Sequence, residues 1–190
     1  MLTLTLHPTL TLTDETFQQL CHHNPTLRLE RTAQGELIAM TPAGSESGRQ
    51  NLSLSAQLWY WNQSTQRGVT FDSSAGFTLP NGAIRSPDAA WIEKSRWEAL
   101  TPEQRQKFAP ICPDFVLELK SPSDDLATLQ AKLEEYITNG ARLGWLIDPS
   151  LKTVHCYRPN QAPELLQHPS SLSGNPVLPN FTLDLTLIWP

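Results

Sequence analysis

Two short polar segments of the chain combine residue types that could carry out hydrolysis. Residues 86–88 (SPD) precede one strand-like stretch, and residues 118–120 (ELK) end another. Because strand side chains alternate between faces, Glu118 and Lys120 must point the same way, and Leu119 the other way. A carboxylate and an ammonium at the end of a buried strand are costly to desolvate unless they pair, bind a metal or act in catalysis.

These side chains could hold a hard divalent cation. If Asp88 comes alongside Glu118, two carboxylates converge and require a positive charge. Mg²⁺, or Mn²⁺ in its place, prefers oxygen ligands, so Asp88 and Glu118 could bind it together with the carbonyl of Leu119 and waters. In metal-assisted phosphodiester hydrolysis such an ion activates a water and stabilises charge on the phosphoryl oxygens, and Lys120 could orient the nucleophile or stabilise the same charge. The pattern therefore predicts a metal-dependent hydrolase.

The elements that must position these residues follow from apolar spacing and turn signals. Residues 111–120 form the most strand-like stretch of the chain, which is typical of a strand covered on both faces at the centre of a sheet. Asn81-Gly82 predicts a hairpin within a run of consecutive antiparallel strands over 68–93. The apolar residues over 45–63 partly follow three-and-four spacing, which predicts a helix.

A second long helix is expected after the central strand. Ser123 is predicted to cap its start, and Asn139-Gly140 to end it. Its apolar residues fall on one stripe that would pack on the sheet. They are Leu126, Leu129, Leu133 and Ile137. A second face carries Asp125, Thr128, Lys132 and Glu135, and its simplest interpretation is a solvated face with favourable charge spacing.

Shorter elements complete the expected fold. Thr13 can cap a short helix, and residues 27–40 read as a hairpin with Gly35 in its turn. Two further strands should flank Asp148-Pro149. Strands before, between and after helices predict an α/β fold with a central mixed sheet flanked by helices. Because no linker, internal repeat or charge block divides the chain, we expect one domain over residues 1–190.

Composition and charge exclude several classes of protein. Lys and Arg number 14 and Asp and Glu number 19, for a net charge of −5, so any contact with nucleic acid must be local or helped by a bound cation. The three cysteines are widely spaced and form no CxxC pair, which argues against a disulfide framework or a zinc site and favours the cytoplasm. Neither a signal peptide nor a run of about 18 apolar residues is visible, so we expect no membrane span.

Both polar segments lie within longer stretches that resemble a known family. SPDAAWIE at 86–93 and CPDFVLELKSPSDDLATLQAKLEEYITNGARLGWLIDP at 112–149 are similar to the Uma-type restriction endonuclease family of the PD-(D/E)XK nuclease superfamily. The likeness covers roughly residues 25–157. It implies a restriction-endonuclease-like fold and Mg²⁺-dependent cleavage of DNA.

The resemblance also implies roles for single residues. Asp88 takes the place of the superfamily's metal-binding Asp, Glu118 that of the second acidic ligand, and Lys120 that of the catalytic Lys. The segment MTPAGSESGRQN resembles the family's first long helix, which makes Glu46 a candidate acidic residue that supports metal binding through water. A Glu in the first turn is equally explained by the helix dipole. Lys132 matches a basic position typical of the family and could approach the same site across the sheet.

Three functions stay open at the level of the sequence. The first is a Mg²⁺-dependent endonuclease acting on DNA, which could work as a homodimer because cleavage of both strands commonly recruits two subunits. The second is a nuclease-fold binding or assembly module without turnover, favoured by the acidic net charge. The third, a metal hydrolase with a substrate other than nucleic acid, has no distinctive motif behind it. Trp97, in a polar segment, could contact a base or a partner.

Overall fold

A six-stranded mixed sheet forms the centre of the computed structural model, which describes residues 2–6, 9–40 and 42–189. The strand order is β11-β10-β9-β8-β7-β4, and neighbouring strands are antiparallel except for the parallel pair β8 and β9. The strands are β4 (Gly68–Asp72), β7 (Ala89–Glu93), β8 (Phe115–Leu119), β9 (Leu143–Asp148), β10 (Thr153–Tyr157) and β11 (Glu164–Gln167). β8 lies inside the sheet and is buried at every position, which confirms the central strand expected from its apolar sequence.

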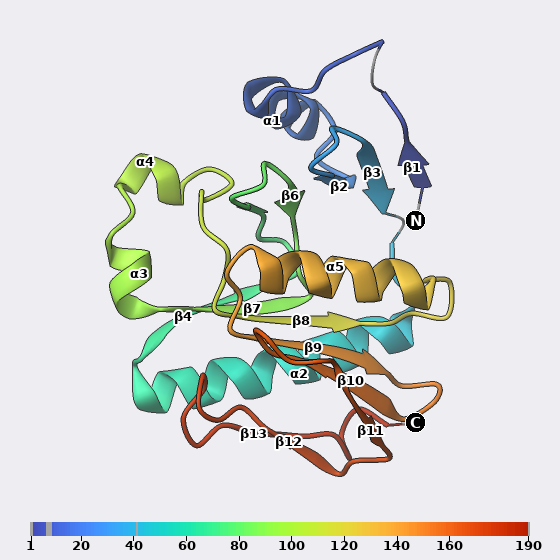
Figure 1. Ribbon diagram of the computed structural model, residues 1–190, viewed down its shortest axis with the longest axis vertical. Coiled ribbons are helices and arrows are strands. Elements are labelled where there is room, and N and C mark those ends of the chain that lie inside the picture. Colours follow the sequence, from blue (N-terminus) through green and yellow to red (C-terminus); the bar gives the residue numbers. More distant parts are fainter. Residues whose placement is uncertain (1, 7–8, 41, 190) are drawn as a thin grey trace.

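One long helix covers each face of this sheet (Figure 1). α5 (Leu126–Thr138) connects β8 to β9 and packs on one face, and α2 (Ser45–Thr65) packs on the other. Because side chains alternate along β8, Leu117 and Leu119 join the apolar core on the α2 side. Glu118 faces α5, where it contacts a lysine of that helix. Strand geometry alone therefore directs the carboxylate away from the larger core.

A second sheet lies on the other side of α5 from the six-stranded sheet (Figure 1). Its order is β1-β3-β2-β6-β5, antiparallel throughout. The strands are β1 (Leu2–Leu4), β2 (Arg28–Arg31), β3 (Leu37–Met40), β5 (Phe77–Thr78) and β6 (Ile84–Arg85). β2 and β3 form the predicted hairpin, with Gly35 at a φ of 82° in its turn. The predicted helix cap is also confirmed, since α1 (Asp14–His23) begins after Thr13 and buries Phe17 against this sheet.

The remaining elements are short. They are α3 (Lys94–Glu98), α4 (Pro102–Arg105), β12 (Ser171–Ser173) and β13 (Thr182–Asp184). α4 begins after Thr101, whose side chain accepts a hydrogen bond from the backbone N–H of Gln104, and Pro102 lies in its first turn. β12 and β13 pair with each other, and residues around them pack into the α2 layer of the core.

Two local predictions are wrong. β4 does not continue into β5 as a paired neighbour: it pairs with β7, whereas β5 and β6 form a hairpin at Gly82 that joins the other sheet. The N-cap of α5 is Asp125, whose side chain accepts from the backbone N–H of Thr128, and not Ser123. Ser123 lies in a turn in which Asp124 already accepts hydrogen bonds from Ser121, so the helix starts after that turn.

The mixed sheet with helices on both faces confirms the predicted α/β class. In the part of the chain that the structure describes, no helix has the length and apolar character that a bilayer crossing requires.

Candidate active site

The register of β7 and β8 brings the two predicted acidic ligands together. Ala89 pairs with Leu117, so one step further the antiparallel register sets Asp88 opposite Glu118. Directly opposite residues share a face, and their Cβ atoms lie about 5 Å apart. Ala89 and Leu117 belong to the core on the α2 side, so Asp88 and Glu118 lie on the α5 face.

Glu118 is a buried carboxylate with one close cation among the residues that the structure describes. Its Oε1 lies 2.8 Å from Nζ of Lys132 and accepts a hydrogen bond from the Tyr136 hydroxyl at 3.4 Å. Burial raises the pKa of Glu118 to about 8, although Lys132 opposes the shift, and the nearby Asp88 and Glu30 raise it further. The protein therefore surrounds Glu118 with more negative charge than Lys132 alone offsets.

Asp88 is held by the end of the neighbouring strand. Its Oδ2 accepts a hydrogen bond from the backbone N–H of Leu119 at 2.9 Å, and its Oδ1 lies 3.9 Å from Nη2 of Arg28. Burial raises the pKa of Asp88 despite that hydrogen bond and the charges of Lys132 and Arg28. Asp88 is thus a fixed carboxylate with a preference for an additional cation, not a turn residue that bonds only its own backbone.

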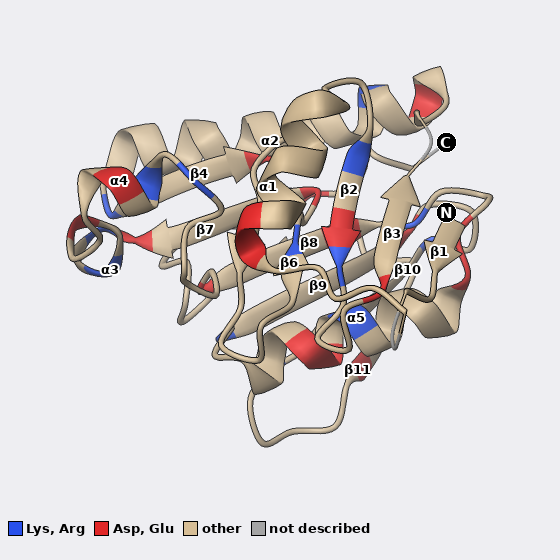
Figure 2. Cartoon of the chain, turned by 90° about the horizontal axis from the view of Figure 1, so that it is seen from above, with Lys and Arg blue, Asp and Glu red and all other residues tan. Residues whose placement is uncertain are grey.

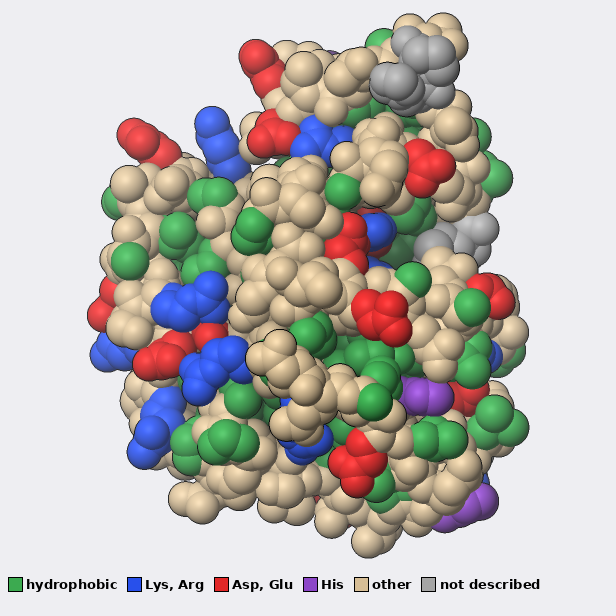
Figure 3. All heavy atoms as spheres, in the orientation of Figure 1, with side chains coloured by type: hydrophobic (Ala, Val, Ile, Leu, Met, Phe, Trp, Pro, Cys, Tyr) green, Lys and Arg blue, Asp and Glu red, His purple; other side chains and the backbone are tan. Residues whose placement is uncertain are grey.

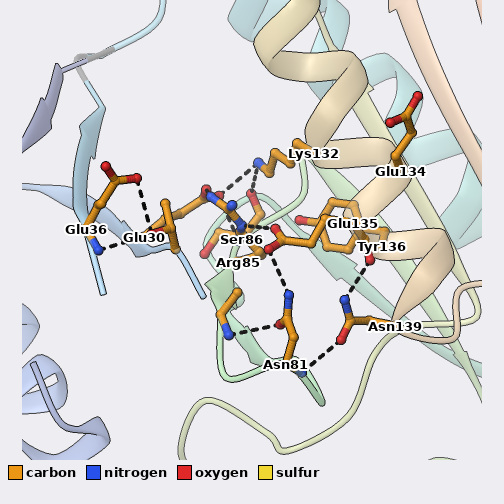
Figure 4. A network of polar contacts seen from close by, with 12 residues as sticks. Glu30, Glu36, Asn81, Arg85, Ser86, Lys132, Glu134, Glu135, Tyr136 and Asn139 are labelled. Atoms are coloured by element: carbon orange, nitrogen blue, oxygen red, sulfur yellow. Dashed lines mark hydrogen bonds and ion pairs between the residues drawn. The ribbon is translucent and has the colours of Figure 1, made fainter. Parts of the chain in front are cut away.

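Lys132 links both sheets at this point, and Figure 4 shows its contacts with Glu30 and Ser86. Its Nζ lies 2.8 Å from Oε1 of Glu118 in β8 and 2.8 Å from Oε1 of Glu30 in β2. Its side chain is 7% exposed. The interpretation of this helix face as solvated is therefore wrong at Lys132, because the second sheet covers the face. The two carboxylates raise the pKa of Lys132 against the effect of burial, so it is a fixed positive charge.

Glu30 organises the segment that leads to Asp88. β2 reads Arg-Leu-Glu-Arg, and Figure 2 shows its acidic residue between basic ones. Glu30 accepts from the backbone N–H of Ser86 at 2.9 Å and pairs with Arg85 at 3.1 Å. The carbonyl of Ser86 also accepts a hydrogen bond from Lys132 at 3.4 Å. Both backbone groups of Ser86 are thus tied to this network two residues before Asp88.

The sequence did not identify Glu30, because its hairpin showed only the alternation of apolar residues. That alternation contained one usable signal: with Leu29 in the small core under α1, Glu30 must lie on the opposite face, toward α5. The signal was insufficient, since it did not show that α5 covers that face.

Lys120 does not join the two carboxylates in the way that was expected. It follows the end of β8, and its Nζ lies 3.7 Å from Oδ2 of Asp148 and 3.4 Å from the carbonyl of Ser121. The described residues that line the cleft at Asp88 and Glu118 do not include Lys120, whereas they include Lys132. The geometry therefore favours Lys132 over Lys120 as the lysine next to the acidic pair.

Glu46 lies at the rim of the same cleft. It is in the first turn of α2, and its side chain is 60% exposed and pairs with Arg49 at 2.6 Å. The hydrogen bond from Arg49 lowers the pKa of Glu46. An exposed carboxylate with its own arginine fits the helix-dipole explanation as well as a water-mediated role, so its part in metal binding stays a prediction.

Glu46, Asp88, Glu118 and Lys132 line a cleft of about 710 Å³, bordered by the first turns of α2 and by the segment that leads from β8 into α5, which we call the acidic cleft. Arg28 also lines it, and its Nε is buried without a hydrogen-bond partner among the described residues. Across the described chain, no three side chains of the Asp, Glu, His or Cys types group closely enough to ligate a metal. An ion here would rely on Asp88, Glu118, backbone carbonyl and water, a donor set of oxygens that suits Mg²⁺.

The contacts of Glu30 predict a loss of stability in acid. Burial raises the pKa of Glu30, but Lys132, Arg85 and hydrogen bonds outweigh it and hold the pKa below the ordinary 4.5. The stabilisation is therefore complete above about pH 4.5 and disappears as the pH falls through the lower folded-state pKa. Urea unfolding should show Glu30→Gln less stable than the unaltered protein at pH 7, by about 1–3 kcal/mol, with the difference shrinking below about pH 4.5.

Glu134→Gln is the matched control for this measurement. Glu134 is an exposed residue of α5 whose side chain points away from the network in Figure 4. This variant should follow the unaltered protein at each pH. A constant difference between Glu30→Gln and the unaltered protein down to strong acid would contradict the assignment.

Comparisons with known proteins agree with the geometry. A family model described as "Uma2: Putative restriction endonuclease" matches residues 14–186. A crystal structure described as a putative nuclease belonging to DUF820 from Anabaena variabilis matches with a TM-score of 0.76 and 21% identity, over 94% of this chain and 97% of that one. At that identity the likeness shows the fold, which is the expected nuclease fold. Among curated proteins, none matches this sequence.

Proposed function

The chain belongs to the Uma2 restriction endonuclease family, and from this we propose that it is a metal-dependent endonuclease that hydrolyses phosphodiester bonds of DNA. The observation that carries the proposal is the meeting of Asp88 and Glu118 in one cleft. Both carboxyl groups have raised pKa values because burial disfavours their charge, and each adds to the demand for a cation. An ion pair of Glu118 with Lys132 that served only the fold would not need Asp88 opposite Glu118.

The chain's own residues have distinct parts in this proposal. Asp88 and Glu118 hold the cation, and the Leu119 N–H fixes the orientation of Asp88. Lys132 stabilises negative charge next to Glu118, the part that the sequence assigned to Lys120. Arg28 lines the cleft with a side chain that is 40% exposed, which suits contact with an oxygen of a backbone phosphate. When bound, Mg²⁺ would supply a Lewis acid for the phosphoryl oxygens and lower the pKa of a water.

Removal of the metal should abolish the activity. We expect purified protein to cleave plasmid DNA in Mg²⁺ or Mn²⁺ and to lose this activity in excess chelator. In calorimetric titration, Asp88→Asn should weaken binding of Mn²⁺ by at least about tenfold, because it removes one of the two carboxylate ligands.

The control is Asp184→Asn, which changes an exposed carboxylate on β13 and should leave the titration unaltered. Cleavage that persists in chelator would refute a metal-dependent mechanism. Equal Mn²⁺ affinity in Asp88→Asn and Asp184→Asn would show that Asp88 is not a metal ligand.

A second candidate function is a nuclease-fold binding module without turnover. Lys132 favours it, because its ammonium already lies 2.8 Å from Glu118, where a lysine can replace part of the charge of a metal. This candidate predicts that millimolar Mg²⁺ does not bind. Under either candidate function, a homodimer stays a prediction.

A further inference from the structure

A second hollow of about 630 Å³ lies next to the acidic cleft, across the turn that follows β4. The turn is closed by a hydrogen bond from the Ala75 N–H to the carbonyl of Asp72 at 3.2 Å. Asp72 and Ser73 line the acidic cleft, whereas Ser74 and Ala75 line the second hollow. The first and fourth Cα atoms of such a turn lie less than about 7 Å apart, so a single extended ligand could reach both hollows.

Aromatic side chains form the walls of this hollow, which we call the aromatic pocket: Phe71, Phe77, Trp97 and Phe108. The ring of Phe71 lies 5.1 Å from the ring of Phe77 and 5.1 Å from that of Trp97, and both contacts are edge to face. Trp97 is only partly buried, so part of its indole is available to a ligand. Fixed aromatic rings with accessible surface are suited to planar ligands such as nucleobases.

Arg105 gives the pocket a positively charged group. Its guanidinium lies 5.6 Å from the centre of the Trp97 ring, and its Nη2 donates to the carbonyl of Glu98 at 2.9 Å. Its Nε is buried and has no hydrogen-bond partner within the described part of the chain. Arg105 as a whole is partly exposed and lines the pocket, so a ligand there can contact its side chain.

Positive charge is available around the pocket for a nucleic-acid backbone. Lys107 lines it together with Arg105. Figure 3 shows Lys and Arg side chains gathered over the side of the molecule where Figure 1 places α3, with Asp and Glu among them. The acidic cleft has little positive charge by comparison, because Lys132 and Arg28 both face carboxylates there.

We propose that the aromatic pocket binds one unpaired base of a nucleic-acid strand whose backbone passes through the acidic cleft. The base stacks on the ring of Trp97 and lies next to the guanidinium of Arg105. The inference rests on the proposed function, and it makes the substrate a strand with an unpaired or flipped base within a few nucleotides of the cut. Stacked nucleotides advance about 3.4 Å each. The distance across the turn, less than about 7 Å, therefore corresponds to a few nucleotides between the unpaired base and the cut.

Binding of single strands with and without bases tests this proposal separately from cleavage. The protein is used in chelator so that no strand is cut, and fluorescence anisotropy compares a thymidine oligonucleotide with an abasic strand of the same length. We expect the thymidine strand to bind about tenfold tighter. Trp97→Ala and Arg105→Lys should each remove most of this preference and leave the affinity for the abasic strand unchanged.

Trp59→Ala is the matched control, because Trp59 is 53% exposed on α2 and does not line the pocket. Arg105→Lys keeps the charge and tests the pocket even if Trp97→Ala fails to fold. An equal preference in both pocket variants and the unaltered protein, or no binding of either strand, would overturn the inference. So would deoxythymidine monophosphate binding as tightly as the strand, which would make the ligand a free nucleotide.

A different result, the absence of DNA cleavage in Mg²⁺, would refute the proposed function. If the protein does not cleave DNA but shows a base preference that depends on Trp97, the result would support base binding in the aromatic pocket and refute the nuclease activity.

Discussion

Glu118→Gln is expected to lower the rate of plasmid cleavage in Mg²⁺ by roughly a hundredfold to a thousandfold, because it removes one of two carboxylates that hold positive charge at the reacting phosphate. The substitution keeps the shape of the side chain and an oxygen that can face Lys132 and Tyr136. The measurement is the initial rate of nicking at equal protein concentration.

This variant distinguishes an effect on the cleavage rate from an effect on the stability of the fold. Burial raises the pKa of Glu118, which favours the neutral form of its carboxyl group, and a neutral amide of nearly the same shape resembles that form. The unfolding free energy in chelator should therefore change by no more than about 1 kcal/mol. Glu164→Gln, on the exposed strand β11, is the control for rate and stability. Nicking by Glu118→Gln at the unaltered rate would show that the activity belongs to a contaminant.

Lys132→Met is expected to destabilise the protein by about 3 kcal/mol, because it leaves Glu30 and Glu118 buried without their shared cation. The loss lies at the lower end of the range for broken buried pairs, since Glu118 can take up a proton and Glu30 retains Arg85. Thermal unfolding should show a decrease in the midpoint of roughly 6–12 °C.

Two lysines serve as comparisons. Lys94→Met removes an exposed pair with Glu98 at 3.8 Å and should cost no more than about 0.5 kcal/mol. Lys120→Met should cost less than Lys132→Met, because its pair with Asp148 is longer, at 3.7 Å. Cleavage rates of these variants below their unfolding temperatures also distinguish the two candidate lysines. Suppose that Lys132→Met keeps normal stability and cleavage while Lys120→Met loses cleavage. These results would identify Lys120, and not Lys132, as the catalytic lysine.

The sequence by itself determined the elements and the position of the acidic pair. Residues 111–120 are apolar enough to form an inner strand, and Glu118 must leave the core side because strand side chains alternate. Thr13, Thr101 and Asn139 set the ends of three helices, since capping depends on residues only a few positions apart. Each of these features is local, so the local sequence is sufficient to predict it.

The tertiary structure decided which residues meet across the chain. The pairing of β4 with β7 joins strands that are not neighbours in the sequence, and the burial of Lys132 between Glu30 and Glu118 depends on α5 lying between two sheets. The spacing of charges along α5 is the same for a solvated face and for a buried one. What distinguishes them is the covering strand β2, about a hundred residues away in the chain, and only packing brings it there. The lysine at the acidic pair therefore comes from the helix, while Lys120 turns to Asp148.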